Sequence, residues 1–329
     1  MQKNILSQLK FDTLIHPLVC FNDSNNYFIK RDDLIPFSFG GNKVRISFEY
    51  FNDMFDKECD CIISYGNIRS NLNRVISNMS HSLSIPCFII SPNDNNESEI
   101  TFNRKISELM GAKIVNCSKR DVAKTVEDTM QHCVNLGYKP YYVYGDIHGK
   151  GNEKIGVNAY FKAYQEIAKY EEENQEKFDY IFLASGTGIT QAGLICGSFA
   201  CEHKPEIIGI SIARKQKEGK NSIDNHVEAF LSKQEMTMLS TKKYSINFID
   251  KYINQGYGKF DLNIEQVIKN VLRFDGIHLD PIYTGKAFSG MKKYILEYGI
   301  EKSNILFLHT GGGPLFFDYI NSHFMNRGI

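Results

Sequence analysis

The sequence predicts an α/β protein with two lobes, each an open and mostly parallel sheet flanked by helices. Three observations predict this fold class. Short β-rich runs alternate with longer helical patterns, as in proteins built from strand–helix–strand units. The β-rich runs are too apolar for strands with one face in water, so each sheet is expected to be covered on both faces. With 329 residues, the chain is long enough to bury two cores.

Short runs rich in β-branched and aromatic residues are predicted as strands. They are Tyr27–Ile29, Cys61–Ser64, Cys87–Ile90, Lys113–Val115, Tyr141–Val143, Tyr180–Leu183, Ile207–Ile212 and Ile305–Leu308. Between several of them lie segments with the apolar spacing of helices. The predicted helices are Arg45–Phe55, Ser70–Ser82, Glu97–Met110, Asp121–Leu136, Asn158–Tyr170 and Thr190–Phe199.

Two polar stretches stand outside this alternation. The tract Glu171–Lys177 is predicted to end a surface helix. The charged segment Arg214–Lys251 is predicted to be an irregular, mobile excursion. The compact run from residue 54 to residue 146 is expected to form a small domain, and residues 1–53 and 147–329 together a large one, with the ligand site in the cleft between them.

Composition excludes several classes of partner. Lys and Arg together number 38, as do Asp and Glu, so the formal net charge is zero. This balance gives no reason to expect nucleic acid or an anionic membrane as a partner. No apolar run approaches a membrane span, and the first residues are too polar for a signal peptide. The 8 cysteines lack the clustered pairs of a metal site. We therefore expect no metal, and free thiols in a reducing cytoplasm.

The first segment with candidate functional residues is KRDDLIPFSFGGNKVR, residues 30–45. Gly40 and Gly41 permit a sharp bend and a close approach of the backbone to a ligand. Lys43 follows at a predicted helix start, where its amine could form a Schiff base with a cofactor. An ordinary exposed lysine is the alternative, and it is the more common outcome for such a residue taken alone.

The second segment is CIISYGNIRSNLNR, residues 61–74. A strand ends at Gly66, and Ser70 or Asn71 can cap the helix that follows. Free N–H groups at a helix start bind a carboxylate or a phosphate. Capping alone is an equally good interpretation of these two residues.

The third segment is FLASGTGITQAGL, residues 182–194. A strand runs into Gly186, Thr187 and Gly188 and then into an Ala- and Gly-rich helix, which indicates an anion cradle of backbone N–H groups. No Gly-Lys-Ser/Thr follows, and the dinucleotide pattern with its later acidic residue is absent, so neither of those nucleotide loops is expected. The alternative is a tight strand–helix turn without a ligand.

The fourth segment is FLHTGGGPLF, residues 307–316. A strand ends at Thr310, whose hydroxyl could face a ring nitrogen, although a simple C-terminal turn would look the same. Upstream, LDPIYTGKA (279–287) and GYGK (256–259) place Tyr283 and Tyr257 in glycine-flanked loops.

The order of these segments resembles that of pyridoxal-phosphate enzymes of the tryptophan-synthase-β type. More narrowly, it is similar to the family of 1-aminocyclopropane-1-carboxylate deaminase and D-cysteine desulfhydrase. The matching stretches are KRDD, GGNKVR, the Ser70-Asn71 loop with Arg74 after it, SGTGITQAGL, DPIYTGKA and HTGG. They extend from about residue 17 to residue 316 and, as a set, are more specific for the fold than for the substrate. The resemblance implies pyridoxal 5′-phosphate as cofactor, bound mainly by the large domain, and a homodimer.

The resemblance also implies a role for each matching residue. Lys43 would carry the cofactor and, once released from it, move protons on the substrate. The other implied cofactor contacts are Asn71 to the ring hydroxyl, Thr310 to the pyridine nitrogen, and Gly186, Thr187, Gly188 and Thr190 to the phosphate. The implied substrate contacts are Arg69, Ser70, Asn71 and Leu72, with Ser70, Tyr257 and Tyr283 placed for proton transfer.

Four positions bear on the substrate and on the phosphate. Arg69 stands where the family usually has Gln, and Leu72 where a polar residue is frequent. Ile46 replaces a lysine that helps to hold the phosphate. Thr284 stands where the deaminases of the family carry Glu, as in the desulfhydrase branch.

The implied activity is a lyase reaction on a small amino acid, a β-elimination that gives a keto acid and ammonia, with D-cysteine as the model substrate. Three alternatives stay open. One is a related enzyme for an acidic or phosphorylated amino acid, an ammonia-lyase or a β-replacing synthase, because the guanidinium of Arg69 suits an anion. The second is 1-aminocyclopropane-1-carboxylate deaminase. The third is a non-catalytic sensor that keeps the fold.

Overall fold

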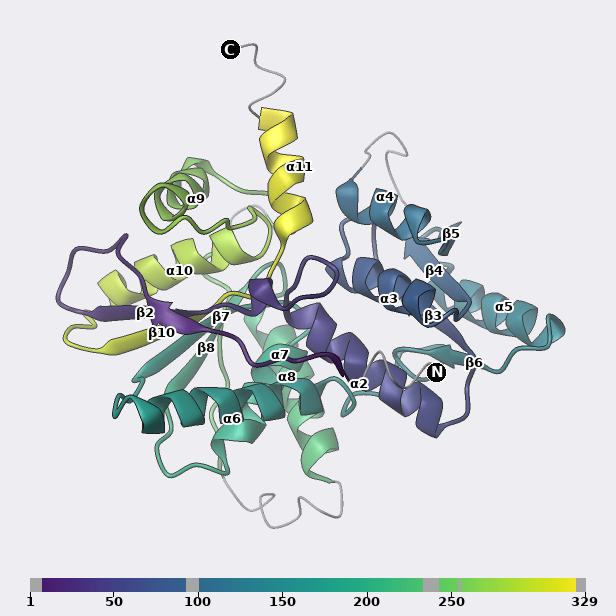
Figure 1. The fold of residues 1–329 in the computed structure, drawn as a ribbon, viewed down its shortest axis with the longest axis horizontal. Helices are drawn as coiled ribbons and strands as arrows, with labels where there is room; N and C mark the ends of the chain where they lie inside the picture. Colours follow the sequence, from purple (N-terminus) through teal and green to yellow (C-terminus); the bar gives the residue numbers. More distant parts are fainter. Residues whose placement is uncertain (1–7, 93–100, 233–242, 254–255, 324–329) are drawn as a thin grey trace.

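The strands of the chain form two separate sheets in the computed structural model, which describes residues 8–92, 101–232, 243–253 and 256–323 (Figure 1). The larger sheet has the order β1-β2-β10-β7-β8-β9. Its strands are β1 (Ile15–Pro17), β2 (Asn26–Lys30), β7 (Tyr180–Ser185), β8 (Glu206–Ser211), β9 (Asn247–Ile249) and β10 (Asn304–Leu308). Only β1 in this sheet pairs antiparallel to its neighbour.

The smaller sheet has the order β5-β4-β3-β6 and is parallel throughout. Its strands are β3 (Cys61–Tyr65), β4 (Cys87–Pro92), β5 (Lys113–Cys117) and β6 (Pro140–Tyr142). Helices α3 (Asn71–Ser82), α4 (Phe102–Leu109) and α5 (Val122–Asn135) surround it. Mostly parallel sheets flanked by helices confirm the predicted fold class. The proposed boundary of a small domain at residues 54–146 encloses this sheet and stays a prediction.

Both faces of the larger sheet are covered because its buried side chains alternate between two cores. Ile181 and Leu183 of β7 pack into one core, and Phe182 between them packs into the other. The first core includes α6 (Val157–Glu173), α7 (Ile189–Ser198) and α8 (Gln216–Leu231). The second includes α9 (Leu262–Asp275) and α10 (Thr284–Glu297). Figure 1 shows these two groups of helices on opposite sides of the sheet.

Three further elements connect these layers. The short helix η1 (Asp32–Leu34) follows β2, and α2 (Asn42–Asp56) contacts both α3 and α6, so it runs between the two parts of the molecule (Figure 1). Helix α11 (Gly313–His323) leaves the end of β10 and packs on α4.

The predicted elements overlap the observed ones wherever the structure describes them. All eight predicted strands coincide with a strand of the structure, and α6 ends at Glu173, inside the polar tract predicted to end a helix. The predicted helix at 97–110 is observed as Phe102–Leu109, and its first four residues lie outside the described ranges.

The prediction of an irregular excursion over residues 214–251 is wrong for most of that segment. Residues Gln216–Leu231 form α8, and Asn247–Ile249 form the edge strand β9. Helix α8 is charged on one side but buries Ile223, Val227 and Phe230 on the other, and this spacing is that of an amphipathic helix. Residues 233–242 lie outside the described part of the chain.

Two further structural findings concern the helices and the cysteines. None of the described helices combines the length and the hydropathy needed to cross a membrane. All of the cysteines are free thiols.

Candidate active site

A cavity of about 590 Å³ lies at the carboxyl ends of strands from both sheets. Its walls include Pro92 at the end of β4 and residues that follow β3, β5, β7, β8 and β10, which is where parallel sheets bind ligands. Every predicted site residue lines it: Lys43, Arg69, Ser70, Asn71, Leu72, Gly186, Thr187, Gly188, Thr190, Tyr257, Tyr283 and Thr310. The fold therefore brings together segments that are far apart in the sequence, while the role of each residue stays a prediction.

Lys43 is the second residue of α2, and two glycines hold this helix start against the end of β10. The backbone N–H of Asn42 donates to the carbonyl oxygen of Thr310 at 3.1 Å. Gly40 and Gly41 have φ of +62° and +97°, and a Cβ on Gly41 would lie 2.7 Å from the same carbonyl oxygen. Only glycine fits so close a passage.

Burial lowers the pKa of the Lys43 amine to about 8, because loss of solvation disfavours the charged form. A tenth of such amines is neutral about one pH unit below the pKa, and only the neutral amine attacks a carbonyl carbon. The geometry thus presents a reactive amine to the cavity.

The predicted anion cradle is the junction of β7 with α7. Gly188 is the N-cap of the helix with φ +89°, and a Cβ there would lie 2.7 Å from Ile223 of α8. The exposed N–H groups and the dipole of the helix favour an anion at this point. The hydroxyl of Thr190 accepts a hydrogen bond from the side chain of Asn42 at 3.0 Å, which ties the cradle to the lysine loop.

Ser70 both caps α3 and lines the cavity, so helix capping and ligand binding, the two functions considered for this residue, are compatible. Its Oγ accepts a hydrogen bond from the backbone N–H of Asn73 at 3.2 Å. A Cβ on Gly66 would lie 2.8 Å from that Oγ, so a glycine is needed where the chain leaves β3. The helix start is left open toward the cavity, where it can receive a carboxylate.

Tyr257 and Tyr283 form a hydrogen-bonded pair with 2.8 Å between their hydroxyl oxygens. Burial raises the pKa of both phenols, so both are protonated at neutral pH and can donate. Asp280 fixes the second of them. Its carboxylate accepts hydrogen bonds from the backbone N–H groups of Ile282, Tyr283 and Thr284 at 2.9, 2.8 and 3.1 Å.

Two of the four positions that differ from the family pattern, Ile46 and Thr284, do not line the cavity. Ile46 is 1% exposed and packs in the core, so its position adds no charge to the cradle. The hydroxyl of Thr284 donates to the Asp280 carboxylate at 2.8 Å and is buried. Position 284 therefore presents no acid to the ligand.

Sequence reasoning missed several polar or aromatic lining residues, among them Tyr65, Lys119, Tyr144 and Arg214. Tyr65 is the last residue of β3, and Lys119, Tyr144 and Arg214 lie just after β5, β6 and β8 respectively. The rule that ligands bind beyond strand ends could have found them. Together with Lys43 and Arg69, the cavity has four cationic lining residues, and none of its described lining residues is Asp, Glu or His.

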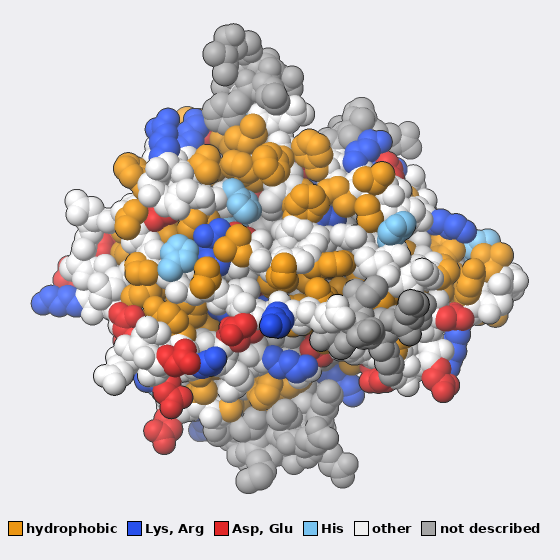
Figure 2. Space-filling model, viewed as in Figure 1, with side chains coloured by type: hydrophobic (Ala, Val, Ile, Leu, Met, Phe, Trp, Pro, Cys, Tyr) orange, Lys and Arg blue, Asp and Glu red, His pale blue; other side chains and the backbone are white. Residues whose placement is uncertain are grey.

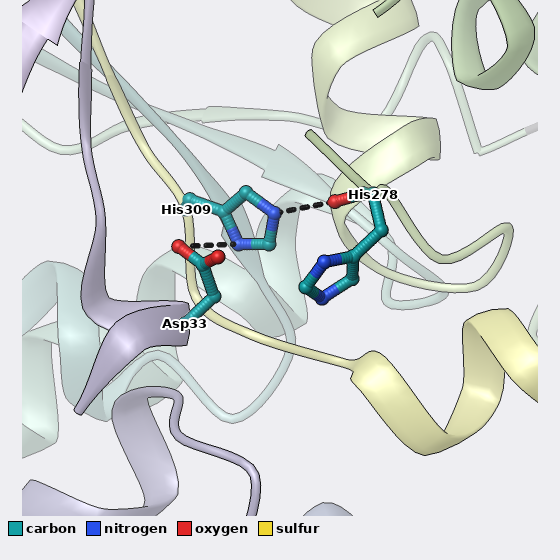
Figure 3. Close-up of side chains that lie close together, drawn as sticks. All are labelled: Asp33, His278 and His309. Atoms are coloured by element: carbon teal, nitrogen blue, oxygen red, sulfur yellow. Dashed lines mark hydrogen bonds and ion pairs between the residues drawn. The ribbon is translucent and has the colours of Figure 1, made fainter. Parts of the chain in front are cut away.

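His309, which precedes Thr310 in the chain, forms a compact group with Asp33 and His278 (Figure 3). His309 Nε2 donates to the carbonyl oxygen of His278 at 2.6 Å, and its Nδ1 accepts from the backbone N–H of Gly311 at 3.1 Å. Arg31 donates two hydrogen bonds to the Asp33 carboxylate at 2.9 and 2.8 Å. These bonds occupy Asp33 and His309 within the protein and fix the strand end that presents Thr310, whereas Nε2 of the His278 ring has no hydrogen-bond partner among the described residues.

Comparison with known proteins gives a consistent result. Residues 7–311 match the family described as pyridoxal-phosphate dependent enzyme. A protein of Pyrococcus abyssi named "Putative 1-aminocyclopropane-1-carboxylate deaminase" is 28% identical over 295 residues, covering 89% of this chain and 86% of that protein.

Solved structures show the same similarity. The crystal structure of an ACC deaminase homologue has a TM-score of 0.82 at 27% identity, covering 98% of this chain and 97% of the other. A hydrogen sulfide-producing enzyme from Fusobacterium nucleatum has a TM-score of 0.64 at 15% identity, covering 94% and 98%. The latter shows a shared fold alone.

Proposed function

This chain belongs to the family of pyridoxal-phosphate dependent enzymes, and from that membership we propose that it is a lyase that eliminates the β substituent of a small amino acid, in the manner of a D-cysteine desulfhydrase. The β substituent leaves with a proton, as hydrogen sulfide in the case of D-cysteine, and water hydrolyses the remaining enamine to a keto acid and ammonia. One observation carries the proposal: the Lys43 amine and the hydrogen-bonded phenols of Tyr257 and Tyr283 line a single cavity. An elimination needs a base for the α-proton and an acid for the leaving group.

The lining residues fit the cofactor. Lys43 offers an amine for a Schiff base, and the N–H groups after Gly186 together with Thr190 suit a phosphate. Thr310 offers a hydroxyl to the ring nitrogen, and Asn71 an amide to the ring oxygen. When bound, the cofactor supplies an electron sink for the electron pair left at the substrate Cα.

Side chains of the protein carry out the proton transfers and bind the substrate. The neutral amine of Lys43 removes the α-proton of the substrate. Tyr257 and Tyr283, both protonated, deliver a proton to the departing β group, and Ser70 receives the substrate carboxylate at the start of α3.

Substrate choice rests on position 284. With Thr284 bonded to Asp280, the cavity has no carboxylate of the kind that the resemblance assigns to the deaminases. We expect D-cysteine to be turned over and 1-aminocyclopropane-1-carboxylate to be turned over at least about a hundredfold more slowly, the loss typical of one missing acid/base group. The test is a panel of D- and L-amino acids and the cyclopropane compound, with ammonia release and the visible spectrum of the protein followed together. Equal rates for the two compounds would overturn the assignment.

A second candidate has specific support from the charge of the cavity. Arg69, Lys119 and Arg214 line it beside Lys43, so an amino acid with an acidic or phosphorylated side chain is the alternative substrate. Arg69→Gln should then reduce kcat/KM for the acidic substrate by about tenfold to a hundredfold and leave the rate with D-cysteine unchanged or higher. Arg120→Gln, an exposed charge outside the cavity, is the matched control. The same loss with both substrates would give Arg69 a structural role.

We also propose that the protein is a cytoplasmic homodimer. The free thiols support a reducing compartment. An apolar groove of about 220 Å³ supports a second copy as partner, because exposed Phe39, Phe102 and Phe317 border it. Figure 2 shows hydrophobic side chains on the face that carries α11 and α4.

A further inference from the structure

Arg74 is a buried cation that has no carboxylate partner among the residues that the structure describes. Its side chain is 1% exposed. One terminal nitrogen donates to the side-chain oxygens of Asn71 and Asn103 at 2.7 and 2.9 Å, and the other donates to the carbonyl oxygen of Gly40 at 3.3 Å. Its Nε is buried without a hydrogen-bond partner. Burial lowers the pKa of the guanidinium to about 9, which still leaves it charged at neutral pH.

An uncompensated buried charge is strongly unfavourable, so an anion is expected near the groups that Arg74 contacts. Two of its three acceptors are structural: the Gly40 carbonyl belongs to the lysine loop, and Asn103 belongs to α4. The third acceptor, Asn71, lines the cavity. The cavity is therefore the place from which a compensating anion can come.

The contacts of Arg74 also fix the orientation of the Asn71 amide. A guanidinium only donates hydrogen bonds, so the amide oxygen of Asn71 must face Arg74. The same oxygen accepts a second hydrogen bond from the side-chain nitrogen of Asn103 at 3.0 Å. Asn103 is itself held, because that nitrogen also donates to the backbone oxygen of Arg69 at 2.9 Å. The Asn71 oxygen is thus occupied, and its Nδ2 group is what remains for a ligand.

An amide oriented in this way can donate to a ligand oxygen but cannot accept from it. It therefore favours an ionised oxygen over a hydroxyl. We propose that Arg74 is a positioning residue that fixes Asn71 as a donor, and that its positive charge, acting together with this donor, keeps the ring oxygen of the bound cofactor ionised. The ionised ring oxygen is in turn a countercharge for Arg74, which has none among the residues that the structure describes. The inference rests on the proposed contacts of Lys43 and Asn71 with the cofactor.

The first test compares Arg74→Gln with Arg74→Lys. Gln can still donate to the Asn71 oxygen but has no charge, whereas Lys keeps the charge. A cofactor joined to lysine absorbs in the visible when its ring oxygen is ionised and in the near ultraviolet when that oxygen is protonated. Arg74→Gln should lower the ratio of the visible to the near-ultraviolet band at neutral pH by about tenfold, equivalent to about 1.4 kcal/mol. Arg74→Lys should keep most of the visible band.

A second variant covers the case in which Arg74→Gln does not fold. Asn71→Asp leaves Arg74 in place and gives it a carboxylate partner in the same position. The cofactor-free variant should therefore melt at a higher temperature than the cofactor-free wild type. With cofactor, its visible band should fall, because the carboxylate repels an ionised ring oxygen and offers it no donor.

The outcomes separate this inference from the proposed function. A wild-type protein that takes up no cofactor would refute both. Other outcomes would refute only the role of Arg74 and leave the proposed function intact. One is a visible band in Arg74→Gln that equals that of the wild type. The other is a visible band that is lost equally in Arg74→Gln and Arg74→Lys. The role of Arg74 would also be refuted if Asn71→Asp kept the same ratio of the visible to the near-ultraviolet band as the wild type.

Discussion

Lys43 owes its reactivity to burial rather than to a charged neighbour, since loss of solvation is the single cause of its lowered pKa. The value of about 8 lies below the 10.5 of an ordinary lysine. At pH 7 the neutral fraction is then about a tenth instead of less than a thousandth. Attachment of an aldehyde should be fast near neutral pH at this residue and slow at exposed lysines.

The cofactor-free protein should therefore take up pyridoxal phosphate at a rate that rises about tenfold per pH unit below about pH 8 and levels off above it. The growth of the visible band after mixing measures this rate. Borohydride should then fix the cofactor to Lys43, as peptide mapping would show, and Lys43→Ala should abolish the adduct, while exposed Lys162→Ala should not. An adduct on another lysine would contradict the assignment.

The same pKa fixes the direction of a stability effect. The folded-state pKa is below the unfolded one, so between about pH 8 and pH 10.5 the unfolded chain binds more protons. The free energy of unfolding contributed by Lys43 rises with pH across that window and is constant above it.

Site residues inside recognisable segments could be predicted from the sequence, and those outside such segments could not. Lys43, Ser70 and Thr310 could be chosen because each follows a glycine-rich or strand-end pattern. Asn103 could not, because it meets Asn71 from 32 positions away through helix packing. Contacts of that kind depend on how two helices dock, and local patterns do not encode it.

Three buried charged residues and the partly exposed Glu166 form a network that holds α2 to its neighbours. Arg45 of α2 contacts Asp32 of η1 at 3.0 Å and Glu166 of α6 at 2.6 Å. Lys30 of β2 contacts Glu166 at 2.6 Å. The network has two cations and two carboxylates, so its charges balance, and it fixes the helix that starts one residue before Lys43.

Removal of one charge from this network should be costly. Asp32→Asn leaves buried Arg45 with an incomplete set of partners and should lower the free energy of unfolding by about 3–5 kcal/mol. Glu108→Gln, which breaks a partly exposed helix pair, should change it by less than about 1 kcal/mol. Denaturant titration of both variants measures the difference, and similar losses would contradict the special role of the network.

Acid should weaken the same network. Burial alone would raise the pKa of Asp32, but Arg45 and Lys30 outweigh that effect and hold it below the ordinary carboxyl value. The stability that Asp32 contributes is therefore present above the ordinary carboxyl pKa and is lost as the pH falls through the lowered one.

Among elements, those with a uniform apolar pattern were predictable and those that depend on pairing were not. The strands of both sheet interiors could be located from their apolar runs. Strand β1 and strand β9 have three residues each and lie at the edges of the larger sheet. These two strands take their structure from the neighbouring strand and carry little signal of their own, whereas β6, which is equally short and also lies at an edge, was located by its two tyrosines.

The exposed apolar groove gives a test for the whole molecule. If a second copy covers it, Phe317→Glu should shift the protein from dimer to monomer, because a carboxylate would be placed in an apolar contact. Light scattering coupled to size-exclusion chromatography measures the mass directly. Leu296→Glu changes an exposed apolar residue away from the groove and is the control. A wild-type protein that is monomeric at micromolar concentration would contradict the proposal.

Strand β10 has a consequence for the synthesis of the protein. It lies in the interior of the larger sheet between β2 and β7, and its first residue pairs with Asn26, which precedes it by 278 positions. On the ribosome, β2 and β7 emerge long before the strand that joins them, and each waits with an unpaired edge open to wrong partners. The larger sheet can close only when translation is nearly finished, so a nascent chain that stalls before residue 304 leaves the ribosome as a candidate for aggregation rather than as a smaller folded protein.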